Sequence, residues 1–269
     1  MTLTSAPDYN RRAMAIDIRS VSEDDFDRAH FIDAYSFTAD RSREARERLK
    51  HMEAMGPTIA VYEDGEMVAC LRILPLRMFM HGVSIPLGGV SSVACLPEHR
   101  RKGYAGRLLR HSLALMREQR QSLSSLWTPH PTLYRRYGWM TASRVLRYAF
   151  DPKDIAPASP ARPEGSARRV TEEAWPTVAE VYRQFAAPRN GYLDRDDRWW
   201  KEAFFRRLYD DKRRPNDVAV WADGKGQPRG YLAYFGNRER RFDGPHIDRL
   251  ALQEFVALDS AAYLGLLRY

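Results

Sequence analysis

The sequence contains only two cysteines, and that scarcity excludes a disulfide-built protein. Cys70 and Cys95 both stand inside apolar segments of a 269-residue chain, which indicates two buried, reduced thiols rather than a catalytic one. No apolar run approaches the roughly 20 residues that cross a bilayer, so we expect no membrane partner. The first residues, MTLTSAPDYNRRAMAID, lack the apolar centre of a secretory signal, and we expect a cytoplasmic location.

Two common phosphate-binding patterns are also missing. The chain has no G-x-x-x-x-G-K-[ST] and no G-x-G-x-x-G after a strand, which excludes a P-loop and the dinucleotide fingerprint. Acidic residues are outnumbered, since 43 Lys and Arg face 35 Asp and Glu, a net charge of +8. The excess favours nucleic acid, a membrane surface or a phosphorylated cofactor. Much of it lies in solvated helix patterns such as RSREARERLK, so charge alone does not choose among these partners.

The order of apolar patterns indicates an α/β (α+β) protein with two units and a mixed central sheet flanked by helices. A Pro-, Ala- and Ser-rich segment at 151–166 has the composition of a linker. It separates a first domain, 1–150, from a second domain, 167–269, whose element order roughly repeats the first. In the first domain we expect a hairpin turn at Asp64-Gly65. Helices are expected over 22–35 and 41–55, behind the basic loop, and at PTLYRRYG; strands are expected over 58–63, 67–80, 89–96, 123–128 and 144–150.

The stretch VSSVACLPEHRRKGYAGRLLRHSLALMREQ, residues 90–119, runs from a strand through a basic loop into a helix. The first turn of a helix has unpaired N–H groups and the positive end of the macrodipole. Gly103 has no side chain to block these amides, and Arg100, Arg101 and Lys102 add positive charge. We therefore expect a pyrophosphate held mostly by backbone. The alternatives are a basic helix start on a solvated surface, and nucleic-acid contact, which the lack of aromatic residues interleaved with the bases disfavours.

Residues 93–107, VACLPEHRRKGYAGR, resemble motif A of GNAT-type N-acetyltransferases, with Arg100, Gly103 and Ala105 at the [R/Q]-x-x-G-x-[G/A] positions. Within that family the chain is similar to the enhanced intracellular survival (Eis) branch, through GGVSSVACLPEHRRKG, LYRRYGW and AYSFTAD. The similarity runs over essentially the whole chain. It implies tandem GNAT folds and an acetyl-CoA-dependent N-acetyltransferase that needs no metal. The second domain lacks the [R/Q]-x-x-G loop, so the resemblance marks it as a degenerate, idle copy.

The resemblance also implies roles for individual residues. Tyr134 would be the general acid that protonates the departing CoA thiolate; its phenol suits that role because a pKa of about 10 is near that of a thiol. The alternative is a core tyrosine. Backbone groups of Val93, Ala94 and Cys95 would bind the pantetheine arm. The pyrophosphate would be cradled by Arg100, Arg101, Lys102, Gly103, Tyr104, Ala105 and Gly106, and Pro129 and His130, where this sequence departs from the usual residues, would line the cofactor.

The acceptor implied by the family is an amine, on an aminoglycoside-like small molecule or on a protein lysine. Asp33, Asp40 and Glu44 lie near the aromatic YSF that lines the acceptor cleft in the family; the alternative for each, which its helical pattern favours, is a solvated helix residue. The family implies a homo-oligomer, a hexamer, and no nucleic-acid partner. It also has a third, sterol-carrier-like domain whose terminal carboxylate is the base; we expect a C-terminally truncated form here, with Tyr269 inside the second domain. The alternative functions are a catalytically idle acyl-CoA-binding or assembly module and, more remotely, a nucleic-acid binder.

Overall fold

A five-stranded sheet forms the centre of the first domain. The structure is a computed structural model that describes residues 15–47, 56–149, 151, 162–207, 215–239 and 247–269. The strand order is β1-β2-β3-β4-β5, and every pair is antiparallel except β4 with β5, which is parallel. The sheet is therefore mixed, as the sequence predicts. The strands are β1 (Ile16–Ser20), β2 (Thr58–Glu63), β3 (Glu66–Met80), β4 (Val83–Cys95) and β5 (Leu123–Ser125).

The turn between β2 and β3 forms where the sequence places it. Asp64 and Gly65 both have positive φ, 50° and 90°, which is the geometry of a two-residue hairpin turn. Glu63 pairs with Glu66 directly across it. The turn fixes which residues of β2 and β3 face each other. Every residue of TIAVYE in β2 is buried, so this register also decides how the centre of the sheet packs.

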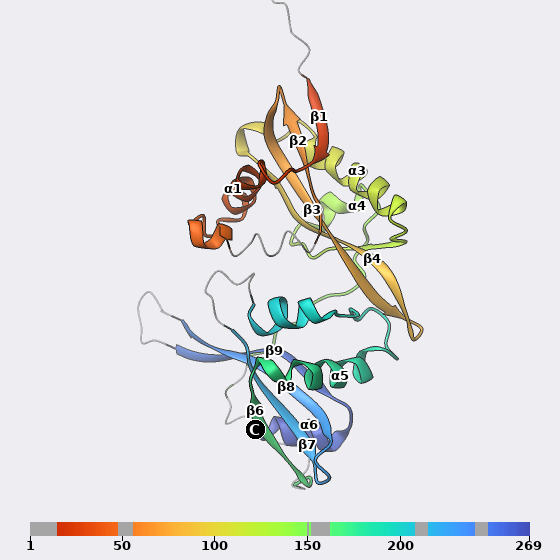
Figure 1. The fold of residues 1–269 in the computed structure, drawn as a ribbon, viewed down its shortest axis with the longest axis vertical. Coiled ribbons are helices and arrows are strands. Elements are labelled where there is room, and N and C mark those ends of the chain that lie inside the picture. The colour runs from red at the N-terminus through yellow and green to blue at the C-terminus, as the bar shows by residue number, and fades with distance from the viewer. Residues whose placement is uncertain (1–14, 48–55, 150, 152–161, 208–214, 240–246) are drawn as a thin grey trace, which may run out of the picture.

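Two helices cover the two faces of this sheet (Figure 1). Helix α1 (Phe26–Phe37) packs Ala29 and Ile32 on one face, against alternate strand residues that include Ala60 and Cys70. Helix α3 (Tyr104–Glu118) covers the other face with an apolar stripe that includes Leu108, Leu109 and Met116. A 3₁₀ turn, η1 (Pro97–His99), precedes α3, and the short α4 (Pro131–Arg135) follows β5. None of the described helices is long and apolar enough to cross a membrane.

The second domain is a four-stranded antiparallel sheet in the order β6-β7-β8-β9. Helix α5 (Trp175–Ala186) and a π-helical segment, η4 (Trp199–Phe205), supply the aromatic core on one face, and α6 (Ser260–Leu267) packs near Trp221 on the other. Most of the expected linker lies outside the described residues, and β6 already begins at 165. The remaining elements are β6 (Gly165–Val170), η3 (Glu172–Ala174), β7 (Asp217–Asp223), β8 (Pro228–Glu239) and β9 (Ile247–Ala257).

The strand expected over 144–150 is wrong for its described part, because residues 140–149 have no regular secondary structure. Val145, Leu146 and Tyr148 are instead 69%, 70% and 79% exposed. Apolar alternation gives a segment strand propensity, but a strand forms only beside a partner that takes its hydrogen bonds. Among the described residues, β5 pairs with β4 alone.

Other boundaries differ less. Helix α1 begins at Phe26 rather than at 22, because the Ser22 hydroxyl accepts the Asp25 N–H at 3.3 Å and closes a turn before the helix. β4 is longer than expected and β5 is shorter. Of the helix expected over 41–55, residues 43–47 are helical, and 48–55 lie outside the described residues.

The β3–β4 hairpin extends past its own domain and reaches the second one (Figure 1). The Phe79 ring belongs to the core cluster of α5, η4 and β7–β9. Backbone hydrogen bonds join β3 to the segment around residues 192–194. The Phe79 N–H donates to the Tyr192 carbonyl at 2.8 Å, and the Asp194 N–H donates to the Arg77 carbonyl at 2.9 Å. The two domains thus share both backbone hydrogen bonds and an apolar core.

We expect Phe79→Ala to lower the free energy of unfolding of the second domain by about 3 kcal/mol, the usual cost of removing a buried phenylalanine ring. Urea titration followed by tryptophan fluorescence measures it, since Trp200 and Trp221 are buried there. Val83→Ala is the control because Val83, at the start of β4, is 61% exposed. Equal midpoints for the two variants would contradict the shared core.

Candidate functional site

Strand β4 separates from β5 partway along its length. The parallel pairing joins Leu87–Gly89 to Leu123–Ser125, and no further β4–β5 pair occurs among the described residues. On its other edge, β4 stays paired with β3 as far as Cys95, which faces Ala69. The edge of β4 that carries residues 90–95 is therefore free to hydrogen-bond an extended ligand through backbone groups.

A β-bulge interrupts this same part of β4. Cys70 faces Ala94 and Arg72 faces Ser91, so Ser92 and Val93 together stand opposite the single residue Leu71. Ser92 has a φ of 53°, in the left-handed region. A bulge re-aims backbone groups and side chains locally and is common beside active sites.

The basic loop follows directly and turns sharply into α3. Arg101 and Gly103 have φ values of 64° and 84°, and only the glycine adopts this region without steric cost. Arg100, Arg101 and Gly103 are exposed. The Arg100 Nε donates to the Cys95 carbonyl at 3.2 Å, which places this guanidinium beside the end of β4. No described side chain caps the N-terminus of α3, so its first amides stay available to an anion.

Buried Glu63, at the end of β2, holds this loop in place. The Lys102 ammonium donates to both of its carboxylate oxygens, at 2.8 and 3.0 Å, and His99 contacts it through Nδ1. These bonds, chiefly the one from Lys102, lower the pKa of Glu63 to about 2. The Lys102 side chain, expected in the pyrophosphate cradle, is thus directed toward the sheet, while its backbone remains in the loop.

The remaining residues of the motif start α3. Tyr104 is 2% exposed, and burial together with the nearby Glu63 carboxylate raises its pKa to about 12. Gly106 faces Tyr137 so closely that a Cβ at this position would lie 2.1 Å from the tyrosine hydroxyl oxygen. Gly106 therefore brings α3 against the segment that follows α4, and Ala105 lies between these two buried positions, itself partly exposed.

Tyr134 lies on α4 and is half-buried. Its ring meets Trp139 edge to face, with centroids 6.3 Å apart, and the Trp139 indole N–H donates to the Ser124 hydroxyl of β5 at 3.1 Å. Burial raises the pKa of Tyr134, and a hydrogen bond with Thr128 opposes that shift. Tyr134 and Val93 pack against the same apolar cluster, which lies on the α3 face of the sheet.

The other candidate residues are placed more loosely. Pro129 and His130 are exposed in the loop before α4. Asp40 accepts the Ser42 N–H at 2.8 Å in a turn, and Glu44 is exposed on the helical segment 43–47. Asp33 instead lines a small cavity beneath α1.

Three contributors to the site had no signal in the sequence: Glu63, Thr128 and His30, which lines the same cavity as Asp33. Glu63 and Lys102 are 39 residues apart, and nothing local to either residue marks the pair.

We expect Glu63→Gln to lower the melting temperature at pH 7 and to lose that effect in acid. The folded-state pKa of Glu63 is about 2, below its ordinary value of 4.5, so its stabilisation is present above about pH 4.5 and is lost as pH falls toward 2. Thermal melts of both proteins at pH 7, 4.5 and 3 should converge. Glu66→Gln, at an exposed position across the turn, is the control; a constant gap between wild type and Glu63→Gln would refute the assignment.

Two stretches of the chain match the acetyltransferase (GNAT) domain family, residues 17–142 and residues 191–269. The chain is also similar to two uncharacterized N-acetyltransferases of Streptomyces avermitilis. One is 27% identical over 198 residues, 69% of this chain and 46% of that protein. The other is 24% identical over 95% of this chain and 63% of that protein. The chain thus spans 46% to 63% of the length of these relatives.

Solved structures share the fold. A probable N-acyltransferase from Enterococcus faecalis superposes with a TM-score of 0.77 at 21% identity, over 94% of this chain and 61% of that one. Eis1 from Mycobacterium abscessus gives 0.70 at 19% identity, over 94% and 62%. These likenesses confirm the predicted architecture, a mixed sheet flanked by helices. With both family matches on the same domain type, the protein is built from two acetyltransferase (GNAT) domains in tandem.

Proposed function

We propose that this protein is an acetyl-CoA-dependent N-acetyltransferase whose first domain binds the cofactor and moves its acetyl group to an amine. The observation that carries the proposal is the opening of β4 from β5 directly before the basic loop. A CoA molecule has an extended arm that carries amides, which suits the open edge of β4. It also has a pyrophosphate, which suits the basic loop. The match of residues 17–142 to the GNAT family supports the same conclusion.

The pantetheine arm would lie along the free edge of β4. Backbone groups of Val93, Ala94 and Cys95 would bond its amides, as in the addition of a strand to a sheet edge. Its pyrophosphate would meet the uncapped first turn of α3, with Arg100 and Arg101 beside it. Glu63 supports this arrangement indirectly, because it keeps the loop that carries these charges in one conformation.

Tyr134 is suited to be the acid. When the amine nitrogen attacks the acetyl carbonyl carbon, a C–N bond forms and the C–S bond breaks, which leaves a thiolate that needs a proton. Burial raises the pKa of Tyr134, so the phenol is protonated at neutral pH and able to donate. Its packing on the apolar cluster that Val93 of β4 also contacts favours an enzyme over an idle acyl-CoA-binding module.

The second domain offers a contrast at the corresponding strand-to-helix junction. The Asp259 carboxylate caps α6 and accepts the Ala262 N–H at 2.8 Å. It also pairs with Arg229 at 2.9 Å. A carboxylate at that position accepts a backbone N–H that an anion would otherwise bind, and its negative charge repels phosphate. We therefore assign cofactor binding to the first domain and infer that the second is the idle copy.

The finer expectations remain part of the proposal. They are membership of the Eis branch, an acceptor amine on an aminoglycoside-like molecule or a protein lysine, a homo-oligomer and a cytoplasmic location. The motif stretches GGVSSVACLPEHRRKG, LYRRYGW and AYSFTAD support the Eis branch.

Isothermal titration calorimetry with acetyl-CoA tests the cofactor. We expect the wild type to bind with a dissociation constant below about 100 μM, within the usual range for enzyme substrates. Gly103→Asp should weaken binding at least about tenfold, because it puts a carboxylate before α3 as Asp259 stands before α6. Gly103→Asn is the matched control, of similar shape and without charge. Absence of wild-type binding would reject the proposed function.

We expect Tyr134→Phe to lower kcat by about 10²-fold with an aminoglycoside as acceptor, since general acid catalysis contributes about 10²–10⁴-fold. Thiol release measures turnover, and calorimetry should show unchanged acetyl-CoA affinity. Tyr148→Phe, which alters a tyrosine that is 79% exposed, should behave as wild type. Equal turnover in wild type and Tyr134→Phe would remove Tyr134 from the mechanism.

A further inference from the structure

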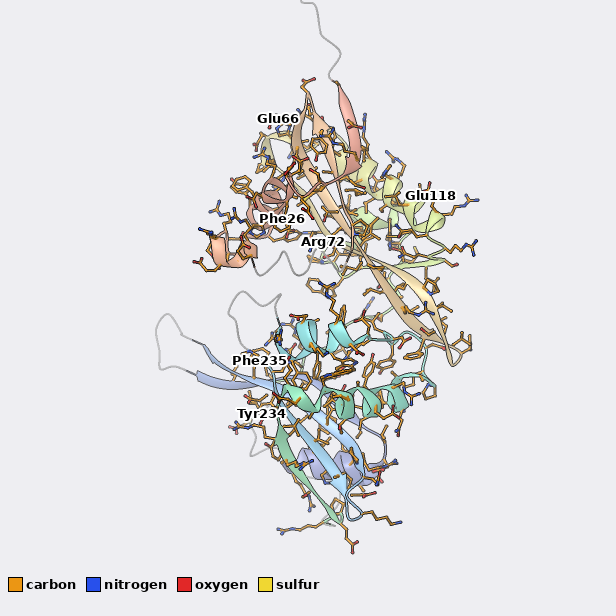
Figure 2. All side chains as sticks on the ribbon, viewed as in Figure 1. Phe26, Glu66, Arg72, Glu118, Tyr234 and Phe235 are labelled. Carbon is orange, nitrogen blue, oxygen red and sulfur yellow. The ribbon has the colours of Figure 1, made fainter. Side chains whose placement is uncertain are left out.

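The second domain contains a pocket that the proposed acetyl transfer does not use. Its volume is about 180 Å³, somewhat more than the roughly 150 Å³ of an apolar cavity that holds one benzene molecule. Helix α5 and the segment that leads into η4 form most of its wall, and Phe79 of the β3–β4 hairpin adds a ring from the first domain. Figure 2 shows side chains of α5 and η4 in the space between these two segments, beside β8 with the labelled Phe235. Both domains therefore build the pocket, which has room for about one aromatic ring and a small substituent.

Aromatic rings make up the inner wall of this pocket. Phe79, Tyr182 and Trp200 are buried, and Trp175 at the start of α5 is partly buried. The Tyr182 and Trp200 rings meet edge to face, with centroids 5.3 Å apart. The lining also includes the exposed Pro176 of α5, so the pocket is open to solvent on that side. Walls of this kind bind flat apolar groups through contacts with ring faces and edges.

One hydrogen-bond donor in the wall lacks an acceptor. Arg195 lines the pocket, and its side chain is only 15% exposed. Its two terminal nitrogens donate to the Glu254 carboxylate at 2.9 and 2.7 Å, and its guanidinium carbon lies 4.0 Å from the centre of the Tyr182 ring. Its Nε atom is buried and has no hydrogen-bond partner in the part of the chain that the structure describes. Such a donor is costly, and an acceptor atom on a bound molecule would remove the cost.

The charged groups of the lining already have opposite charges beside them. Arg183 pairs with Glu180 at 2.8 Å on α5. The Asp194 carboxylate lies 3.9 Å from the Arg77 Nε, and the buried Arg195 guanidinium has its carboxylate partner on β9. A full charge on a ligand would therefore enter the pocket without a counter-charge, and burying an unmatched charge is costly. The lining thus favours an uncharged molecule.

We propose that this pocket is a ligand site for an uncharged, single-ring aromatic molecule that carries a carbonyl acceptor, of the class of aromatic carboxamides. The ring would lie among the four aromatic side chains of the wall, and the carbonyl oxygen would accept the Arg195 Nε–H. The site is independent of the proposed acetyl transfer, because none of its lining residues belongs to the opened edge of β4, the basic loop or α4. The second domain, to which we assign no cofactor, thus has a ligand site of a different chemistry.

Heteronuclear NMR of the nitrogen-labelled full chain tests the site, with benzamide, toluene, benzoate and benzylamine as the molecules added. We expect benzamide to shift the indole N–H signals of Trp175 and Trp200, with a dissociation constant of about 1 mM, a usual affinity for a ligand of this size. Toluene lacks the acceptor, and benzoate and benzylamine each carry a charge. Each of these three should therefore bind at least about tenfold more weakly than benzamide.

Variants test the space and the donor separately. Ala179→Leu puts a larger side chain into the pocket from α5, so it should weaken benzamide binding at least about tenfold. Thr177→Leu is the matched control, because Thr177 is an exposed residue of the same helix outside the lining, and it should bind benzamide as the wild type does. Arg195→Lys keeps a positive charge opposite Glu254 but removes the guanidinium Nε–H. It should therefore bind benzamide and toluene about equally, and melting temperatures report whether each variant is folded.

Each result supports or overturns the site. Absence of benzamide binding to the wild type overturns it, as does benzamide binding that a folded Ala179→Leu leaves unchanged. Tighter binding of benzoate or benzylamine than of benzamide overturns the assignment to an uncharged ligand. If either variant loses its fold, the wild-type comparison of benzamide with toluene decides. A clear preference for benzamide then supports the role of the Arg195 donor, and equal affinities overturn it.

Discussion

A strand that binds a ligand along one edge has to be held along the other, and the β3–β4 ladder meets that constraint here. β4 is paired with β3 from Val83 to Cys95, with one bulge, while its pairing with β5 covers only Leu87–Gly89. Without the ladder, the opened edge at residues 90–95 would be free to shift register or to pair with another chain. The pairing of the strands therefore positions the site, and the side chains depend on that pairing. The basic loop and Tyr134 are placed by where β4 ends and where β5 leaves it.

The two domains differ at the start of the helix that follows the fourth strand, and this difference alters what each helix start can bind. In the first domain, Gly103 precedes α3 and leaves the first amides of that helix without a side-chain partner. In the second domain, Asp259 precedes α6, and its carboxylate accepts the Ala262 N–H of that helix. The two helix starts thus have opposite preferences for an anion. Net charge does not reveal this difference, since +8 is a property of the whole chain. The local field at each helix terminus decides it.

The sequence predicts those parts of the structure that depend on neighbouring residues. The Asp64-Gly65 turn, the strand-loop-helix order around Gly103 and the amphipathic α3 all follow from local pattern, and all are present. The contacts that finish the site are non-local. Glu63 meets Lys102 across 39 residues, and the His30 cavity draws on α1, β2, β3 and β4. The prediction of a strand at 144–150 was wrong for a related reason. A strand forms only beside a partner strand, and the local alternation of apolar residues carries no information about a partner.

The hairpin that carries the site also limits how the protein can be divided. Phe79 completes an apolar core that otherwise comes from the second domain, and Met78 bridges to Leu193. A first domain expressed by itself would expose this ring, and a second domain alone would contain a void in its place. Although both domains are of one type, the hairpin makes them interdependent, so separating them would cost each domain part of its packing.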